Sequence, residues 1–211
     1  MAELDLTNIA STSISTPASG VIAEFADSVH KTLKSKDDAG FIDGHFYNFS
    51  TASQAPAATT RTYITGSKIT IPKGKLQIGT CFRWMFSLTK TGAGTATSTI
   101  DIAVGTAGTT ADAARVSFTK PAGTAVIDEA WFEVTCICRG PLSASGVFAG
   151  QLVMTHNLQT TGHAAIPCVV VNTISGAFDV TTADLFVGLC ITSGASDAVT
   201  LQVVTAEAWN I

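Results

Sequence analysis

The residues of this chain that could do chemistry are four histidines, five cysteines and a scattered set of carboxylates. His156 and His163 flank a polar segment that we expect to form a loop between two strands. Two histidines placed in this way could join a carboxylate as metal ligands. Histidines of this kind more often lie exposed or make ordinary hydrogen bonds, so we expect no metal site.

The carboxylates between residues 100 and 190 form no recognisable catalytic pattern. Glycoside hydrolysis needs two carboxyl groups about 5–10 Å apart in a cleft, and no spacing singles out such a pair. Most of them follow or end turn-like segments, where capping and Asx-turns are the usual roles. The chain also lacks a Gly-x-Ser-x-Gly elbow, a phosphate loop and a dinucleotide fingerprint. We therefore expect neither an enzyme nor a bound cofactor. The carboxylates in question are Asp101, Asp112, Asp128, Glu129, Asp179 and Asp184.

The cysteines are odd in number, and the N-terminus lacks the basic and apolar regions of a secretion signal. Each cysteine lies in an apolar, strand-like run, so we expect five buried free thiols rather than disulfides. Cys136 and Cys138 share a strand face, but no second ligand pair at metal spacing accompanies them. The five are Cys81, Cys136, Cys138, Cys168 and Cys190.

Charge is sparse in this chain. Only 13% of the residues are charged and the formal net charge is −4, against about a quarter charged in an ordinary soluble domain. The loose cluster Lys31, Lys34 and Lys36 is too small for phosphate contacts, which excludes direct nucleic-acid binding. No apolar run reaches the roughly 20 residues needed to span a bilayer. The low charge fits either a Thr-rich sandwich or a surface covered by other subunits.

A strand pattern surrounds these residues. Between residues 81 and 88, aromatic and aliphatic side chains alternate with a less apolar set that includes Arg83 and Met85, which predicts a strand with one face on a core. We expect a second subunit to pack on the Arg83 and Met85 face. The predicted core consists of Phe82, Trp84, Phe86, Leu88, Ile100, Ile102, Val104, Phe132, Val134 and Val187.

Repeated short strands separated by Gly, Thr, Ala and Pro turns indicate an all-β chain. We predict an antiparallel β-sandwich, jelly-roll-like, with an extended N-terminal arm and a small hairpin. The expected strands are 61–71, 80–89, 98–105, 114–119, 130–139, 146–155, 167–173, 184–192 and 198–209.

The expected organisation is an arm and hairpin at 1–50, a linker at 51–60 and the sandwich at 61–211. The first 50 residues have no evident core of their own, so we expect them to contact another subunit or a partner. A helix over 21–34 remains the alternative to the hairpin. The aromatic patch of Phe46, Tyr47 and Phe49 is either a ligand-stacking platform or, more in keeping with its position, an anchor for the linker. The expected contact residues are Leu4, Leu6, Ile9, Ile14, Val21, Phe25 and Leu33.

Two stretches carry a family resemblance. Residues 16–21 and 31–40, with a Pro-x-x-Gly at Pro17 and the turn Asp37-Asp38-Ala39-Gly40, resemble a hairpin segment of tail-fibre and related virion proteins of tailed bacteriophages. The turns between residues 69 and 209 are similar to those of phage β-sandwich modules.

The resemblance implies a virion structural protein. We expect a homotrimeric cement or decoration protein that stabilises the capsid shell by binding major capsid protein subunits at the outer capsid surface. It would be made in the cytoplasm of the host bacterium. The alternative is a tail-fibre or tailspike component that binds a host-surface glycan or protein through loops 89–98, 105–114 and 156–166. Those loops are short of aromatic residues, which disfavours sugar binding there.

Overall fold

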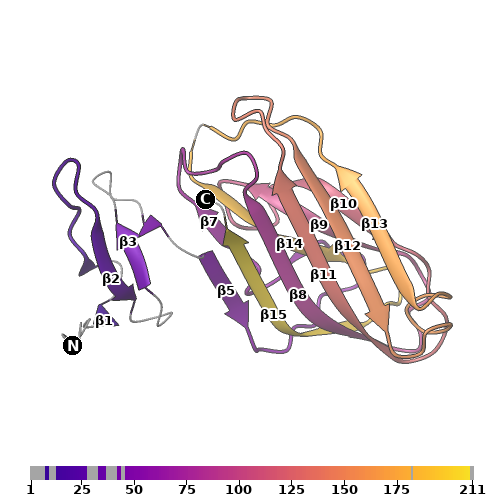
Figure 1. The fold of residues 1–211 in the computed structure, drawn as a ribbon. Coiled ribbons are helices and arrows are strands. Elements are labelled where there is room, and N and C mark those ends of the chain that lie inside the picture. The colour runs from indigo at the N-terminus through magenta and orange to yellow at the C-terminus, as the bar shows by residue number, and fades with distance from the viewer. Residues whose placement is uncertain are drawn as a thin grey trace. The chain divides into compact units, whose positions relative to one another are not determined.

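The computed structural model describes residues 8–9, 13–27, 33–36, 42–43, 46–181 and 183–209, and its regular elements are β-strands. The chain divides into two compact units, residues 1–45 together with Ile211, and residues 46–210 (Figure 1). In the described part of the chain, no helix has the length and apolarity required to cross a membrane.

The N-terminal unit holds a small sheet in the order β1 (Asn8–Ile9), β2 (Ala23–Asp27), β3 (Leu33–Lys36) and β4 (Ile42–Asp43). β2 pairs antiparallel with β3, and β1 runs parallel to β2. The hairpin is therefore present and the helical alternative over 21–34 is wrong, because cross-strand pairing holds both segments extended. The expected Asp37–Gly40 turn lies outside the described residues.

The larger unit is an antiparallel β-sandwich. Its first sheet has six strands in the order β13 (Cys168–Ile174), β12 (Phe148–His156), β11 (Asp128–Cys138), β8 (Cys81–Lys90), β15 (Val199–Trp209) and β5 (Phe46–Ser50). Every neighbouring pair is antiparallel. β5 pairs with β15 from Phe46 to Ser50, so these residues belong to the sandwich rather than to the expected arm.

The second sheet runs in the order β10 (Ala113–Lys120), β9 (Ser98–Gly105), β14 (Leu185–Thr192) and β6 (Thr62–Tyr63), and β7 (Ile69–Ile71) also pairs with β14. β8 pairs with β15, and β9 pairs with β14. This nested pairing of early with late strands is the jelly-roll-like feature of the fold. The strand expected at 61–71 is divided into β6 and β7 by a turn in which Gly66 has a φ of 87°, a conformation that favours glycine.

The core lies between the two sheets. The side chains predicted for it, from Phe82 to Val187, are between 0 and 3% exposed. On β8 the inward positions include Trp84, whose indole Nε1 donates to the Ser67 carbonyl at 2.7 Å. Phe86 stacks on Phe132 of the neighbouring strand, with ring centroids 5.0 Å apart. Because alternate strand positions face opposite sides, this packing directs the intervening residues of β8 outward.

The thiols follow the same alternation. Cys136, Cys138 and Cys190 are buried and free, as expected, and burial raises the pKa of each thiol. Cys168 is exposed and Cys81 is half-buried, so the expectation of burial is wrong for these two. Both occupy outward positions of their strands, which an apolar run alone does not reveal.

Candidate functional site

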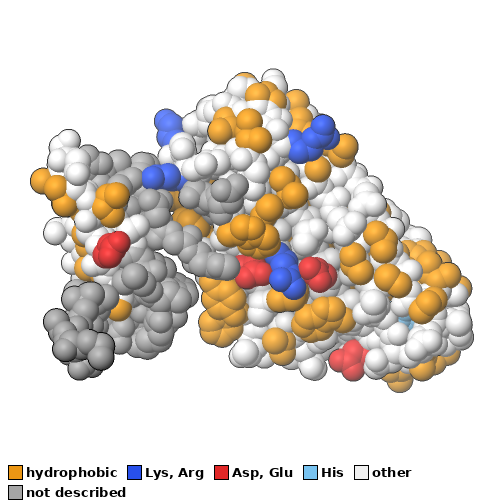
Figure 2. All heavy atoms as spheres, in the orientation of Figure 1, with side chains coloured by type: hydrophobic (Ala, Val, Ile, Leu, Met, Phe, Trp, Pro, Cys, Tyr) orange, Lys and Arg blue, Asp and Glu red, His pale blue; other side chains and the backbone are white. Residues whose placement is uncertain are grey.

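The outer face of the six-stranded sheet is the candidate functional surface. Strand register aligns its outward side chains in rows that cross the sheet. Facing positions on neighbouring antiparallel strands have Cβ atoms about 5 Å apart, so each row is a continuous strip. Figure 2 shows hydrophobic side chains spread widely over the sandwich surface in this view, with few charged ones among them.

One row is entirely apolar, and we call it the apolar row. It crosses five strands without a charged or polar side chain. Ile174 is 57% exposed and Ile137 is 46% exposed, and a shallow groove of about 700 Å³ runs beside them. The apolar row consists of Cys81, Ile137, Ala149, Ile174 and Trp209.

Two carboxylates on this face pair with Arg83. Its guanidinium lies 3.0 Å from the Glu133 carboxylate and 3.5 Å from the Glu207 carboxylate. All three side chains are partly exposed, so each pair stabilises the fold by only about 0–1 kcal/mol. Gln151 and Asn172, on neighbouring strands, hydrogen-bond to each other at 2.9 Å. The polar groups next to the apolar row are therefore largely paired among themselves.

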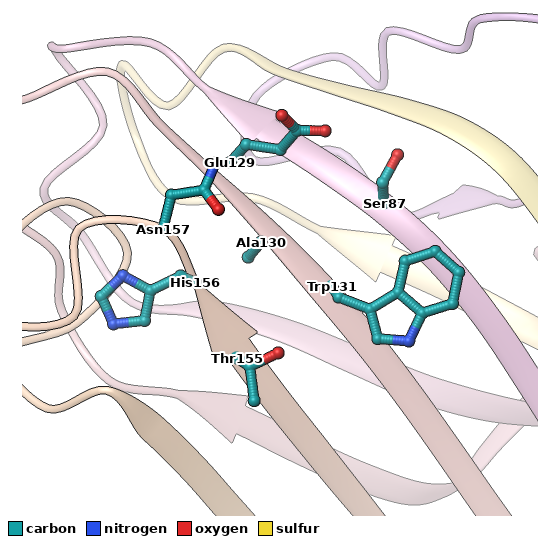
Figure 3. A pocket seen from close by; sticks show the side chains of 7 residues that line it. All are labelled: Ser87, Glu129, Ala130, Trp131, Thr155, His156 and Asn157. Carbon is teal, nitrogen blue, oxygen red and sulfur yellow. The ribbon is translucent and has the colours of Figure 1, made fainter.

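The other end of the face holds an exposed tryptophan. Trp131 on β11 is 45% exposed and lies in register between Ser87 on β8 and Thr155 on β12. With Glu129 and Asn157 these side chains surround an opening of about 300 Å³ above Ala130 (Figure 3). We call this feature the Trp131 hollow. Its lining residues are Ser87, Glu129, Ala130, Trp131, Thr155, His156 and Asn157.

Sequence reasoning missed this tryptophan because it searched the loops for exposed aromatic residues. The signal was present in β11. Ala130 and Phe132 face the core, so the residue between them must face outward. Of the three loops considered for binding, only 156–166 reaches the hollow, through Asn157.

Beneath the hollow lies a buried polar cluster built on Asp128. Its carboxylate accepts hydrogen bonds from His156 Nδ1 at 2.7 Å, from the His163 backbone N–H at 2.9 Å and from the Leu158 N–H at 3.3 Å. Gly162, at a φ of 83°, lets the loop backbone approach this carboxylate closely. The side chains of Asp128 and His156 are fully buried. The cluster thus ties the 157–163 loop to the start of β11.

The two loop histidines are used structurally. His156 Nε2 lies 2.7 Å from the Ile166 carbonyl, and His163 Nε2 lies 3.1 Å from the Leu88 carbonyl. Hydrogen bonds to the carboxylate lower the pKa of Asp128 against the opposing effect of its burial. Among the residues that the structure describes, no group of three His, Cys, Asp or Glu side chains is placed to hold a metal ion.

The remaining carboxylates of interest act in turns and ion pairs. Asp112 accepts from the backbone N–H groups of Ala107 and Gly108 at 2.9 and 2.7 Å. Asp179 accepts from the Thr181 N–H in its own turn, as expected, whereas Asp184 accepts from the N–H of the distant Lys73 at 2.8 Å. Asp101 instead pairs with Arg61 through two hydrogen bonds of 2.6 and 3.0 Å. None of these contacts arranges two carboxylates across a cleft.

The aromatic patch near residue 46 is part of β5. Tyr47 and Phe49 are exposed and stack at 5.7 Å on the outer side of that strand. Backbone pairing with β15, rather than the aromatic rings, attaches this segment to the sandwich.

The predicted partner-contact residues are only partly described. Leu4 and Leu6 lie outside the described residues, and Ile9 and Leu33 lie in β1 and β3 with undescribed side chains. Ile14 is half-buried and Val21 is 50% exposed. Phe25 is only 3% exposed, so it stabilises the fold and presents no contact surface.

The fold defines the class of this protein as an antiparallel β-sandwich. No protein-family model matches the chain, and no curated protein matches it. Among solved structures, the chain is similar to the CBM2 module of the evolved Dit protein of Lactobacillus casei BL23 phage J-1, at 9% identity, with 80% of this chain and 99% of that chain covered and a TM-score of 0.29. It is also similar to a Bauhinia forficata lectin in complex with GalNAc, at 11% identity, 90% and 92% coverage and a TM-score of 0.28. A legume lectin-like domain from Entamoeba histolytica matches at 8% identity, 79% and 90% coverage and a TM-score of 0.22. Similarities this weak carry no argument about function.

Proposed function

We propose that the protein is a structural subunit of a tailed-bacteriophage virion, a cement or decoration protein that forms homotrimers on the outer capsid surface. The observation that carries this proposal is the apolar row with its neighbouring groove. Soluble monomers rarely expose contiguous apolar patches larger than a few hundred Å². Interface cores are depleted of charge, as this row is. The row would pack against a second copy of the chain.

The N-terminal unit would supply the capsid contact. It has its own small sheet, and two adjacent residues in it, Val21 and Ile22, are 50% and 65% exposed. Exposed aliphatic side chains on a separate unit support a role in binding the major capsid protein. Removing residues 1–42 should abolish capsid attachment and leave the sandwich folded. Full decoration of capsids by the truncated protein would contradict this assignment.

Self-association is tested on the apolar row. The double variant Ile137→Lys, Ile174→Lys places two charges in the row at exposed positions, so the fold should persist while the assembly dissociates. Ile127→Lys is the matched control, because Ile127 is 68% exposed and lies outside the sheet. Sedimentation equilibrium should give the mass of three chains for the wild type and the control, and of one chain for the double variant. A single-chain mass for the wild type at micromolar concentration would refute the trimer.

The location in the virion is tested by electron microscopy of intact particles. A cement protein should be present in hundreds of copies over the capsid. The alternative, a tail-fibre or tailspike component that binds a host-surface receptor, predicts about a dozen copies confined to the tail.

A further inference from the structure

We propose that the Trp131 hollow is a binding site for a neutral saccharide, a hexose or N-acetylhexosamine unit of a surface glycan. The inference does not rest on the trimer proposal, because the hollow and the apolar row lie at opposite ends of the outer face. Three rows of β11, at Trp131, Glu133 and Thr135, precede the row of Ile137. No residue of the apolar row lines the hollow, so the two sites can be tested separately.

Trp131 supplies the stacking surface. It is held on a central strand of the sheet, between β8 and β12, and is 45% exposed. An indole ring combines a large apolar face with little conformational freedom, so stacking on it costs little ordering entropy. The C–H face of a pyranose ring is flat and apolar, and it matches such a ring in size and chemistry.

The rim of the hollow supplies hydrogen-bonding groups. The Ser87 and Thr155 hydroxyls stand on either side of Trp131 in the same row. The Thr155 hydroxyl can both donate and accept, whereas the Ser87 hydroxyl donates to the Gln202 carbonyl at 3.2 Å and offers its oxygen as an acceptor. Asn157 adds an amide with two donors and an acceptor, and Glu129 adds a carboxylate (Figure 3). Sugar hydroxyls need this mixture, because each of them is both a donor and an acceptor. A few polar groups around an aromatic surface are the usual composition of a small-ligand site.

Charge selects the class of saccharide. The charged side chains near Trp131 on this face are acidic, namely Glu129 in the hollow and Glu133 one position further along the outer side of β11. Arg83, the nearest cation on the same face, is already paired with Glu133 and Glu207. A sialylated or sulfated glycan would meet repulsion here, whereas a neutral sugar would not.

The buried cluster below gives the hollow its rigidity. The Asn157 N–H donates to the Glu129 carbonyl at 3.0 Å, which ties the two ends of the rim together. Asp128, adjacent to Glu129, holds His156 and Leu158 on either side of Asn157. A preformed rim lowers the entropic cost of binding.

The volume of about 300 Å³ accommodates one or two sugar rings in an open site. We expect a dissociation constant of about 1 mM for a single site, because an open hollow buries only part of its ligand. Several copies on one particle would raise the avidity for a surface by about 10²–10⁴.

The test is a titration of the full chain with free neutral sugars, in which ¹H–¹⁵N NMR monitors the indole N–H groups of the three tryptophans. A glycan array provides an independent screen. The Trp131 indole resonance should shift with a neutral hexose or N-acetylhexosamine and stay in place with N-acetylneuraminic acid. Trp131→Ala should weaken binding at least tenfold. Phe49→Ala is the matched control, since Phe49 is an aromatic residue that is 55% exposed on the edge strand β5, outside the hollow and the apolar row, and it should change binding less than twofold.

Two further variants make the test decisive. Trp131→Phe should retain part of the affinity, because a smaller aromatic ring remains at a position that the core does not need. Glu129→Gln removes the acidic charge of the rim, so N-acetylneuraminic acid should shift the Trp131 resonance of this variant. The proposal is overturned if no neutral sugar shifts the Trp131 resonance at about 10 mM, or if Phe49→Ala weakens binding as much as Trp131→Ala.

Discussion

Acidification should destabilise this protein through His163, well above the pH at which carboxylates titrate. The imidazole is fully buried, and its Nδ1 has no hydrogen-bond partner among the described residues. Burial, followed by the positive charge of Lys120, lowers the pKa of His163 from 6.5 to about 4. The Lys120 ammonium lies beside it, donating to the His163 carbonyl at 2.8 Å.

The sign and size of the effect follow from proton linkage. Below pH 6.5 His163 becomes protonated in the unfolded chain, whereas in the folded chain it stays neutral until the pH approaches its pKa of about 4. Stability is therefore fully present above pH 6.5 and is lost as the pH falls toward 4. A difference of roughly 2.5 pKa units corresponds to about 3 kcal/mol, of which about 2 kcal/mol should already be lost at pH 4.5. Asp128, whose pKa is lowered, adds its own loss only below that range.

The matched variant is His163→Gln, because a glutamine amide can replace Nε2 as the donor to the Leu88 carbonyl without titrating. Urea unfolding of both proteins at pH 7.0, 5.5 and 4.5 measures the free energy of unfolding. The wild type should lose about 2 kcal/mol more than the variant between pH 7.0 and 4.5. Equal losses in the two proteins would refute the assignment of His163 as a buried neutral histidine.

Three further substitutions test the packing of the sandwich by thermal or urea unfolding. Arg61→Lys should destabilise by about 2 kcal/mol, because a single ammonium cannot reproduce the two hydrogen bonds to the buried Asp101 carboxylate; a loss below about 0.5 kcal/mol would contradict the geometry. Trp84→Phe should cost about 2–4 kcal/mol, through a cavity in the core and the lost hydrogen bond to the Ser67 carbonyl; a neutral result would place Trp84 outside the core. Val203→Gly should be neutral or stabilise by up to about 1 kcal/mol, because Val203 adopts a φ of 50° at the β15 bulge and is 49% exposed; a clear destabilisation would exclude backbone strain there.

Much of the fold was predictable from local alternation. The strands from 80–89 to 198–209 were expected within about two residues of their observed bounds, since inward and outward side chains must alternate on a sheet with one face buried. The turn carboxylates were also predictable, because an aspartate beside a tight turn finds backbone N–H groups locally. Asp112 and Asp179 act in this way.

The candidate site was not predictable in the same way. The rows of the outer face depend on which strands are neighbours, and Ile137, Ala149 and Ile174 become one strip only through the pairing of β11, β12 and β13. The strand at 46–50 was likewise missed, because a short edge strand is stabilised by a partner about 150 residues away, and no local signal specifies that partner.

The strand at Cys81–Lys90 illustrates both what the sequence alone determines and what only the tertiary structure decides. Its sequence alone determined that Phe82, Trp84 and Phe86 face a core and that Arg83 and Met85 face away from it, because side-chain direction along a strand is a local property. Only the tertiary structure decided that β11 and β15 lie on either side of it, which pairs Arg83 with Glu133 and Glu207 and places Ser87 beside Trp131. Strand order depends on the free energy of the whole packed sandwich, and distant segments contribute to it as much as near ones.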